Sequence, residues 1–334
     1  MSGYRLDVSD EYSHQASEES NFNESVYVNS WDINQKVGLW SRIGNRINEG
    51  HAEMSVCIYL PDGRVACQFQ RPGITSNDQH EAAGLKYKVV EPFKAVTMNY
   101  TGEVMILDDP QLLRTPGRMF KTAPRAQCQF ELSLTGLSPM NGGEPTDPDA
   151  ETMYGRDFSL GHFNQHARSV GHISVGDESW QIDGHGWRDH SWGPRFWTNI
   201  YYYRLFIANF GDDRGLMMLK RIDRKGVTHR RGVLMFDGQY EQILDMDVFT
   251  EWDENKDPAG VRLGIRTDKR KVRMEGKILT VAPLRNHREV NGESLECRIA
   301  EAFTEWTWDD GRPGIGITEY IEFMQDGEPV GYPL

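Results

Sequence analysis

HISVGDESWQID, residues 172–183, is the stretch that indicates the fold class. Its β-branched and apolar residues alternate in part with polar ones, and Val175-Gly176-Asp177 interrupts them as a turn signal. Similar runs recur along the chain, among them MSVCIYL (54–60), QCQFELSL (127–134) and NIYYYRLFIANF (199–210). The pattern predicts an all-β protein with roughly sixteen to eighteen strands, too many for one sheet. Two antiparallel barrels or sandwiches suit that number.

A chain of 334 residues has the length of about two domains. Residues 1–26 are polar and acidic without apolar periodicity, so we expect a flexible acidic arm or a strap over the first domain. The first β domain then covers residues 27–185 and the second covers 186–334. The looser stretch 138–157 is expected to be a flap or connector, and DDPQLL near residue 108 is a short helix candidate.

The composition excludes several classes of partner. Fifty acidic residues against 37 basic ones give a net charge of −13, which disfavours nucleic acid and anionic lipid. No apolar run is long enough to span a bilayer, and the N-terminus does not resemble a secretion signal, so we expect a cytoplasmic protein. Cys57 and Cys67 would face opposite sides of a hairpin around PDGR. We therefore expect all four cysteines to be free thiols.

The usual catalytic and cofactor motifs are missing from the sequence. It contains no GxSxG, P-loop, HExxH or CxxC. Five histidines fall within 29 residues, but none forms a diagnostic metal motif. They are His162, His166, His172, His185 and His190. Convergent ligands are possible on strands, yet hydrogen bonding to backbone or carboxylates explains such histidines more simply. We expect no metal and no cofactor.

Proton transfer fits the segment GHGWRDHSWGPRFW, residues 184–197. If the segment is extended, Asp189 shares a face with Trp187 and Ser191, while His190 points to the opposite face with Arg188 and Trp192. An indole beside a carboxyl group removes water from it and raises its pKa, so that the acid can protonate an alkene or enol. The following aromatic residues, Trp197, Tyr201, Tyr202 and Tyr203, could stabilise a carbocation.

A purely structural alternative stays open for the same segment. Asp189 could pair with Arg188, Arg195 or His190 and lock the joint between the two domains. The tryptophans would then be packing residues.

The motif DHSWG (189–193), with Trp187 before it and Arg195-Phe196-Trp197 after it, resembles the Asp-His-x-Trp-Gly signature of the carotenoid 1,2-hydratase and AttH-like proteins. In related bacterial sequences a His-x-x-Gln strand, here His162 and Gln165, precedes the motif. The resemblance is specific over about 35 residues. Ser191 departs from it, because asparagine is usual at this position in the hydratases. This replacement puts hydration itself in question.

The resemblance implies two tandem lipocalin-like barrels, an apolar cavity and no organic cofactor. It also implies that Asp189 donates a proton to a double bond. The candidate catalytic residues are Asp189, His190 and His162. The candidate substrate-binding residues are Trp187, Trp192, Trp197, Tyr201, Tyr203, Gln165 and His185. Glu305 and Glu319 are weaker candidates for a second acid or base.

Three functional hypotheses follow. The first is a cofactor-independent hydratase, isomerase or lyase that acts on a small hydrophobic molecule, isoprenoid- or steroid-like. The second is a non-catalytic carrier of hydrophobic ligands, because lipocalin-type barrels commonly hold them. The third makes residues 184–197 structural, and the protein acts through a partner at its surface.

Overall fold

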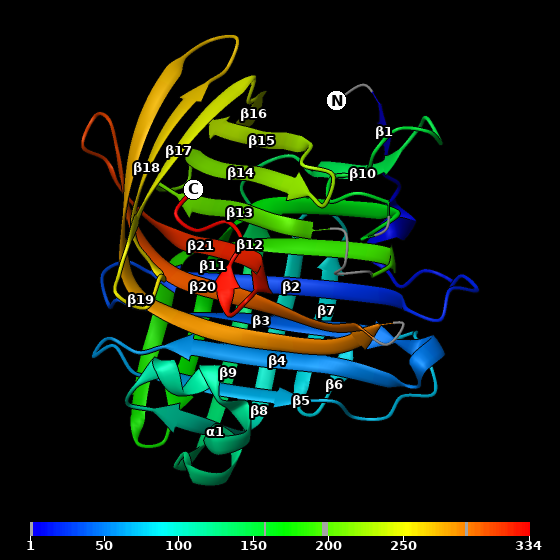
Figure 1. Ribbon diagram of the computed structural model, residues 1–334, viewed down its shortest axis with the longest axis vertical. Helices are drawn as coiled ribbons and strands as arrows, with labels where there is room; N and C mark the ends of the chain where they lie inside the picture. Colours follow the sequence, from blue (N-terminus) through cyan, green and yellow to red (C-terminus); the bar gives the residue numbers. More distant parts are fainter. Residues whose placement is uncertain (1–2, 157, 196–199, 291–292) are drawn as a thin grey trace. The chain divides into compact units, whose positions relative to one another are not determined.

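The computed structural model describes residues 3–156, 158–195, 200–290 and 293–334 (Figure 1). Its strands form two antiparallel sheets, which confirms the predicted all-β class. The chain divides into two compact units. Unit 1 consists of Met1–Leu60, Ala66–Ile106 and Pro124–Trp197, and unit 2 of Pro61–Val65, Leu107–Ala123 and Thr198–Leu334. The division after residue 197 differs from the expected boundary at 185/186, which lies within a strand of unit 1.

Unit 1 contains the first sheet. Its strands are β1 (Tyr4–Arg5), β2 (Phe22–Asp32), β3 (Val37–Arg46), β4 (His51–Tyr59), β5 (Val65–Gln70), β6 (Glu81–Ala82), β7 (Leu85–Glu91), β8 (Ala95–Leu107), β9 (Arg125–Gly136), β10 (Asn141–Pro145), β11 (Gly161–Val175) and β12 (Glu178–Pro194). The pairing runs β11-β12-β2-β3-β4-β5-β8, and β9 pairs with both β8 and β11, so these strands form a closed ring. Closure satisfies the backbone of both edges, as in a barrel.

The interior of this ring is filled by apolar side chains. Alternate residues such as Val26 and Val28 of β2 and Ile173 of β11 are fully buried in one cluster. The two-residue turn Gly176-Asp177 joins β11 to β12, as the sequence predicts. Gly176 has a φ of 58°, a left-handed conformation that suits glycine. The long β11–β12 hairpin carries the candidate catalytic residues, His162 on β11 and Asp189 and His190 on β12.

The acidic N-terminal segment is a strap with ordered contacts. β1 pairs with β10, and a 3₁₀ turn at Val8–Glu11 buries Glu11. The Glu11 carboxylate accepts hydrogen bonds from Arg188 and, at 2.6 Å, from the backbone N–H of Phe93. β2 begins at Phe22, inside the segment that we expected to be a flexible arm up to residue 26. The N-terminal segment is held by charged and polar contacts and not by an apolar face. Its sequence therefore has no apolar periodicity, and its composition alone suggests that it is mobile.

The stretch 138–157 contains one strand that the sequence does not predict. β10 pairs with β11 although it reads NGGEP, because Gly142 and Gly143 allow close approach of the backbones. A Cβ on Gly142 would lie 2.2 Å from the carbonyl oxygen of His162. The same stretch provides the buried side chains of Met153 and Tyr154.

Unit 2 contains the second sheet. Its strands are β13 (Ile200–Asn209), β14 (Arg214–Asp223), β15 (Thr228–Phe236), β16 (Gln239–Gln242), β17 (Asp245–Trp252), β18 (Pro258–Arg266), β19 (Lys271–Val290), β20 (Glu293–Trp308), β21 (Pro313–Gln325) and β22 (Glu328–Pro329). The order is β16-β15-β14-β13-β21-β20-β19-β18-β17, with β22 on β21. In the described strands β16 and β17 remain the two edges, so this sheet is curved but open (Figure 1).

The concave core of unit 2 is built around aromatic residues. Phe206, Trp306 and Tyr320 pack edge to face within it. A register shift between Ile278 and Thr280 in β19 is a bulge, a feature that bends a strand. The helix candidate near residue 108 is confirmed as a 3₁₀ turn, Pro110–Arg114, followed by the short helix α1 (Pro116–Thr122).

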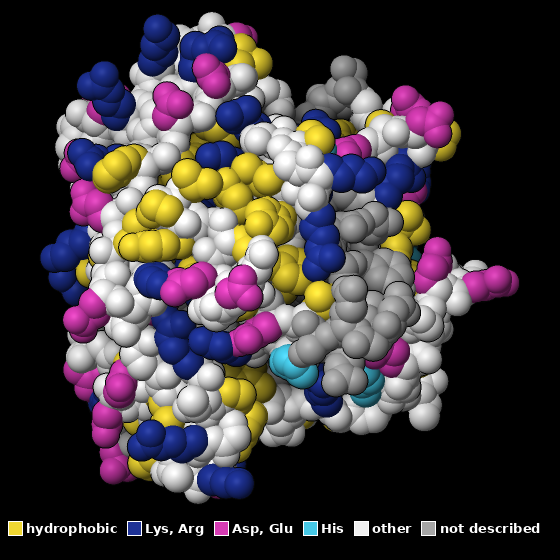
Figure 2. All heavy atoms as spheres, viewed as in Figure 1, with side chains coloured by type: hydrophobic (Ala, Val, Ile, Leu, Met, Phe, Trp, Pro, Cys, Tyr) yellow, Lys and Arg dark blue, Asp and Glu magenta, His cyan; other side chains and the backbone are white. Residues whose placement is uncertain are grey.

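The surface carries charged side chains of both signs (Figure 2), and the cysteines form no disulfides in the structure. Figure 2 shows basic and acidic side chains interspersed on one face of the molecule. All four cysteines are free and buried, as predicted. Within the described ranges, no helix has the length and apolar character needed to cross a membrane.

Candidate functional site

β12 is extended through the DHSWG motif, so its side chains alternate between two faces as predicted. Ile182 of the same strand belongs to the barrel core, which places Arg188 and His190 on the inner face. Trp187, Asp189 and Ser191 therefore lie on the outer face. This outer face is also buried, because Trp187 is only 1% exposed. The neighbouring residues of one motif thus belong to two different environments.

Asp189 and His162 form a pair on the outer face. His162 of β11 is in register with Ser191, which makes it a diagonal neighbour of Asp189 on the same face. Its Nε2 lies 2.5 Å from Oδ2 of Asp189. The His162 side chain is 2% exposed and that of Asp189 is 19% exposed. The two candidate catalytic residues therefore lie within hydrogen-bonding distance of each other at a place where the carboxylate remains accessible.

One aromatic ring contacts this pair, and a second lies on the same face of β12. The Tyr154 ring packs edge-on to His162, with 4.7 Å between ring centroids. Trp187 packs in the same manner on His166, at 4.6 Å. His185 is half-buried further along the same face. His162 thus has the Tyr154 ring beside it, and Trp187 precedes Asp189 on the same face of β12.

Arg195 lies at the end of the same strand and has no carboxylate partner among the described side chains. Its Nη2 donates to Oγ of Ser191 at 2.8 Å, and its guanidinium stacks 4.0 Å from the Phe158 ring centroid. Burial, followed by repulsion from the nearby Arg42 and Arg46, lowers the pKa of Arg195 to about 9, although attraction by Asp189 and Glu53 opposes this shift. A buried cation of this kind favours an anionic or strongly polar ligand group.

The contacts of Asp189 differ from those that the structural alternative requires. In the described contacts Arg188 pairs with Glu11, His190 with Glu24 and Arg195 with Ser191. None of these three residues bonds to Asp189, whose partner is His162. Among the described contacts no arginine forms an ion pair with Asp189, although Arg195 interacts with it electrostatically from beyond ion-pair distance.

The inner face of β12 has a separate network. Arg188 donates to Oε1 of Gln165 at 2.8 Å, and Gln165 donates to the backbone oxygens of Ser138 and Phe93. These bonds tie Gln165 to the strap and to the loops at this end of the barrel. Gln165 does not lie beside Asp189.

His190 and Trp192 also lie on the inner face. His190 Nε2 is 2.5 Å from Oε1 of Glu24, and the Trp192 ring stacks on His14 at a centroid distance of 3.9 Å. Trp192 donates its indole N–H to Glu144. His190 therefore cannot orient Asp189 directly, and His162 does so instead.

The aromatic candidates of β13 belong to unit 2. Tyr203 is buried, and its hydroxyl lies 2.5 Å from a carboxylate oxygen of Glu319. Glu319 is directly opposite Glu301 on β20, and burial, followed by repulsion from Glu319, raises the pKa of Glu301 well above its usual value. Tyr201 is half-buried. Trp197 lies outside the described residues.

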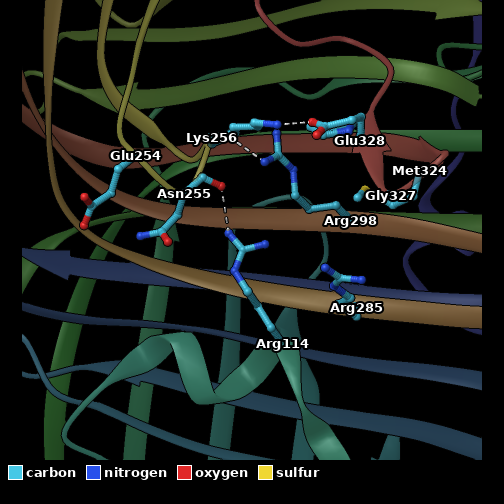
Figure 3. A pocket seen from close by; sticks show the side chains of 10 residues that line it. Arg114, Glu254, Asn255, Lys256, Arg285, Arg298, Met324, Gly327 and Glu328 are labelled. Atoms are coloured by element: carbon cyan, nitrogen blue, oxygen red, sulfur yellow. Dashed lines mark hydrogen bonds and ion pairs between the residues drawn. The ribbon is translucent and has the colours of Figure 1, made fainter.

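A surface pocket of about 190 Å³ lies in unit 2 (Figure 3). Its basic residues are Arg114, Lys256, Arg285 and Arg298. Each of them has an acidic partner: Asp257, Glu328, Glu296 and Glu322 respectively. Since these charges are already compensated, the pocket is a weaker anion site than Arg195.

Residues 7–324 match a family model described as Domain of unknown function (DUF7064). The chain belongs to this family. No curated protein matches the sequence of this DUF7064 protein.

Solved structures share the fold of the DUF7064 chain at low sequence identity. A Nitrosomonas europaea protein assigned to AttH (NE1406) has a TM-score of 0.59 at 13% identity, over 96% of this chain and 97% of the other. CghA with Sch210972 has a TM-score of 0.57 at 11% identity, over 93% and 94%. Kievitone hydratase from Nectria haematococca has 0.56 at 12%, over 90% and 89%. The likeness confirms the AttH-type, lipocalin-like architecture.

Several residues of these networks were not identified from the sequence. Glu11, Glu24 and His14 lie far in sequence from the β12 residues that they contact, and no local motif marks them. Tyr154 lies close in sequence to His162, but in a stretch without strand pattern, so nothing indicated that its ring packs there. Glu301 could have been suspected from the sequence, because it shares a strand face with the candidate Glu305. In the structure it lies opposite the candidate Glu319.

Proposed function

We propose that this protein is a cofactor-independent hydratase, isomerase or lyase that acts on a small hydrophobic molecule. The Asp189–His162 pair would carry the proton. The observation that supports this proposal is the 2.5 Å contact between His162 Nε2 and Asp189 Oδ2 on a buried, aromatic face. A carboxyl–imidazole pair held in this way can give and take one proton without a cofactor.

In the proposed hydration, the proton held between Asp189 and His162 is transferred to one carbon of a double bond. The π electrons form the new C–H bond and leave a cation on the second carbon. Aromatic rings stabilise such a cation through their quadrupoles. Water adds to the cation and returns its surplus proton to the Asp189–His162 pair, which restores the catalyst. Loss of a different proton from the cation instead gives an isomer.

Arg195 is suited to hold a polar group of the substrate. It is buried, and among the described contacts it donates a hydrogen bond to the Ser191 hydroxyl and forms no ion pair with a carboxylate. Asp189 and Glu53 attract its charge only from beyond ion-pair distance. A carboxylate, phenolate or carbonyl oxygen on an otherwise apolar molecule would compensate this charge. The proposed substrate is therefore hydrophobic with one oxygen-bearing group.

The shared fold agrees with this proposal. One structural neighbour is named as a hydratase, and this chain shares its lipocalin-like fold. Ser191 binds Arg195 in this chain, so the residue that departs from the hydratase signature has a role in placing the cation. A carrier that uses the barrel interior is less well supported, because apolar side chains of the described strands fill it.

The test is turnover of a panel of isoprenoid alcohols, carotenoids and sterols in ¹⁸O-labelled water, followed by mass spectrometry. We expect the wild type to add one labelled water to a panel member, and Asp189→Asn to lose at least about 100-fold in rate. Asp183→Asn is the matched control, since Asp183 lies on the same strand with a side chain that is 74% exposed. Wild-type activity in Asp189→Asn would contradict the proposed role. Binding without conversion across the panel would favour the carrier.

A further inference from the structure

A second cluster of ligand-type side chains lies on the inner face of β12, independent of the proposed active site. It brings together His190 of β12, Glu24 of β2 and His14 of the N-terminal strap. One ligand atom from each residue lies within 4.8 Å of the other two. Oε1 of Glu24 is 2.5 Å from Nε2 of His190 and 3.0 Å from Nδ1 of His14. Three segments that are distant in sequence thus converge on one carboxylate oxygen.

Two of the three side chains in the cluster are closed to solvent. The side chains of Glu24 and His190 are 0% and 1% exposed, and that of His14 is 20% exposed. Trp192 covers His14 by stacking on its ring at 3.9 Å. Such burial excludes water that would compete for the ligand atoms, and it leaves His14 as the accessible side of the cluster.

The donor set is the type that borderline transition metals prefer. Two imidazoles and a carboxylate bind Zn²⁺ with bonds of about 2.0–2.2 Å, while Ca²⁺ and Mg²⁺ require more oxygen ligands. An ion bound at these distances brings tetrahedral ligand atoms to about 3.4 Å from one another. Ligand atoms that already lie within 4.8 Å need only small side-chain rotations to reach this geometry.

His14 also has the outer contact that is characteristic of metal-binding histidines. Its Nε2 faces Oδ1 of Asp10 at 3.4 Å, while its Nδ1 faces Glu24. A proton on Nε2, directed at Asp10, leaves the lone pair of Nδ1 pointing at the Glu24 carboxylate. Lone pair against lone pair is unfavourable unless a cation lies between them. Carboxylate–histidine–metal triads use this arrangement.

The nearby His80 supplies a further unsatisfied nitrogen. Its ring centroid lies 5.4 Å from that of His190, and its buried Nε2 has no hydrogen-bond partner among the described residues.

We propose that His14, Glu24 and His190 bind one divalent transition-metal ion, which fastens the N-terminal strap to the barrel of unit 1. His80 is close enough to contribute a fourth ligand after a side-chain movement. The competing explanation is that a proton on His14 occupies the place of the metal and that the cluster is only a hydrogen-bonded network. The two explanations differ in whether zinc binds and in whether the strap responds to it.

The experiment is titration of chelator-treated, full-length protein with Zn²⁺ in competition with a chromophoric chelator. We expect one ion per chain, with affinity at least tenfold weaker in His14→Gln and Glu24→Gln. Asp10→Asn is expected to weaken binding about 10-fold or more, as outer contacts of metal ligands do. His172→Gln is the matched control, because His172 lies on β11 outside the cluster and should leave binding unchanged.

Two readouts on the wild type keep the proposal testable if a variant fails to fold. Co²⁺ should give the visible absorption bands of a four- or five-coordinate site. Zn²⁺ should also slow proteolytic cleavage at the exposed strap residues 18–20, because it holds His14 in place. Absence of stoichiometric Zn²⁺ binding in the low micromolar range, or wild-type affinity in His14→Gln, would overturn the proposal in favour of the proton-bridged network.

Discussion

The ion pair between Glu11 and Arg188 offers the sharpest test of how the N-terminal strap is held. Both side chains are buried, with exposed fractions of 0% and 2%. Arg188 donates to the two Glu11 oxygens at 2.7 and 2.9 Å, and the Phe93 N–H adds a third bond. Glu11→Ala leaves a buried guanidinium without its carboxylate. Breaking a buried pair on one side costs about 3–5 kcal/mol.

This cost should appear in urea unfolding of the full-length protein at pH 7. With a slope of about 2–3 kcal/mol/M, the midpoint of the transition that includes unit 1 falls by about 1–2.5 M. Glu18→Ala is the matched control, since Glu18 is exposed in the same strap and should change the midpoint little.

A double-mutant cycle separates the pair from its surroundings. Arg188→Met removes the partner charge, so Glu11→Ala should cost much less in that background, with a coupling energy of at least about 2 kcal/mol. If Glu11→Ala behaved like Glu18→Ala, or if the two substitutions were additive, the strap would not be anchored by this pair and our account of its order would be refuted.

Two other predictions concern charged groups in the two units. Burial lowers the pKa of Arg195 to about 9, which means that its charge destabilises the folded state at pH 7, so Arg195→Met should raise the melting temperature of the protein while it abolishes turnover. A lower melting temperature would contradict this destabilising effect. The pKa of Glu301 is raised by burial, so its stabilising effect is present below about pH 4.5 and is lost as the pH rises through the higher folded-state value. In the Glu301→Gln variant, the free energy of unfolding should therefore fall less between pH 5 and 8 than it does in the wild type. If the two proteins showed the same pH dependence of the free energy of unfolding, the raised pKa of Glu301 would be contradicted.

The local features of this protein were predictable because they depend on short-range periodicity. The alternation in residues 172–183 predicts the β11–β12 hairpin, and the same period of two places Asp189 and His190 on opposite faces. The geometry of the PDGR hairpin predicts free thiols, which the structure confirms. Asp189 and His162 were both identified as site candidates from their motif.

The partners of these residues were not predictable, because they come from distant segments. The sequence leaves Arg188, Arg195 and His190 as possible partners of Asp189, while the pairing of β11 with β12 selects His162. It also suggests a mobile arm, although Glu11 and His14 of that arm are held by Arg188 and Glu24.

The sequence by itself determined the strand class, the turns and the face on which each motif residue lies, since a strand alternates whatever packs against it. Only the tertiary structure decided which charge meets which, because closing the barrel brings together the N-terminal strap, β2, β11 and β12. Burial then makes each of those encounters energetically important, since a buried charge must find a partner and an exposed one need not.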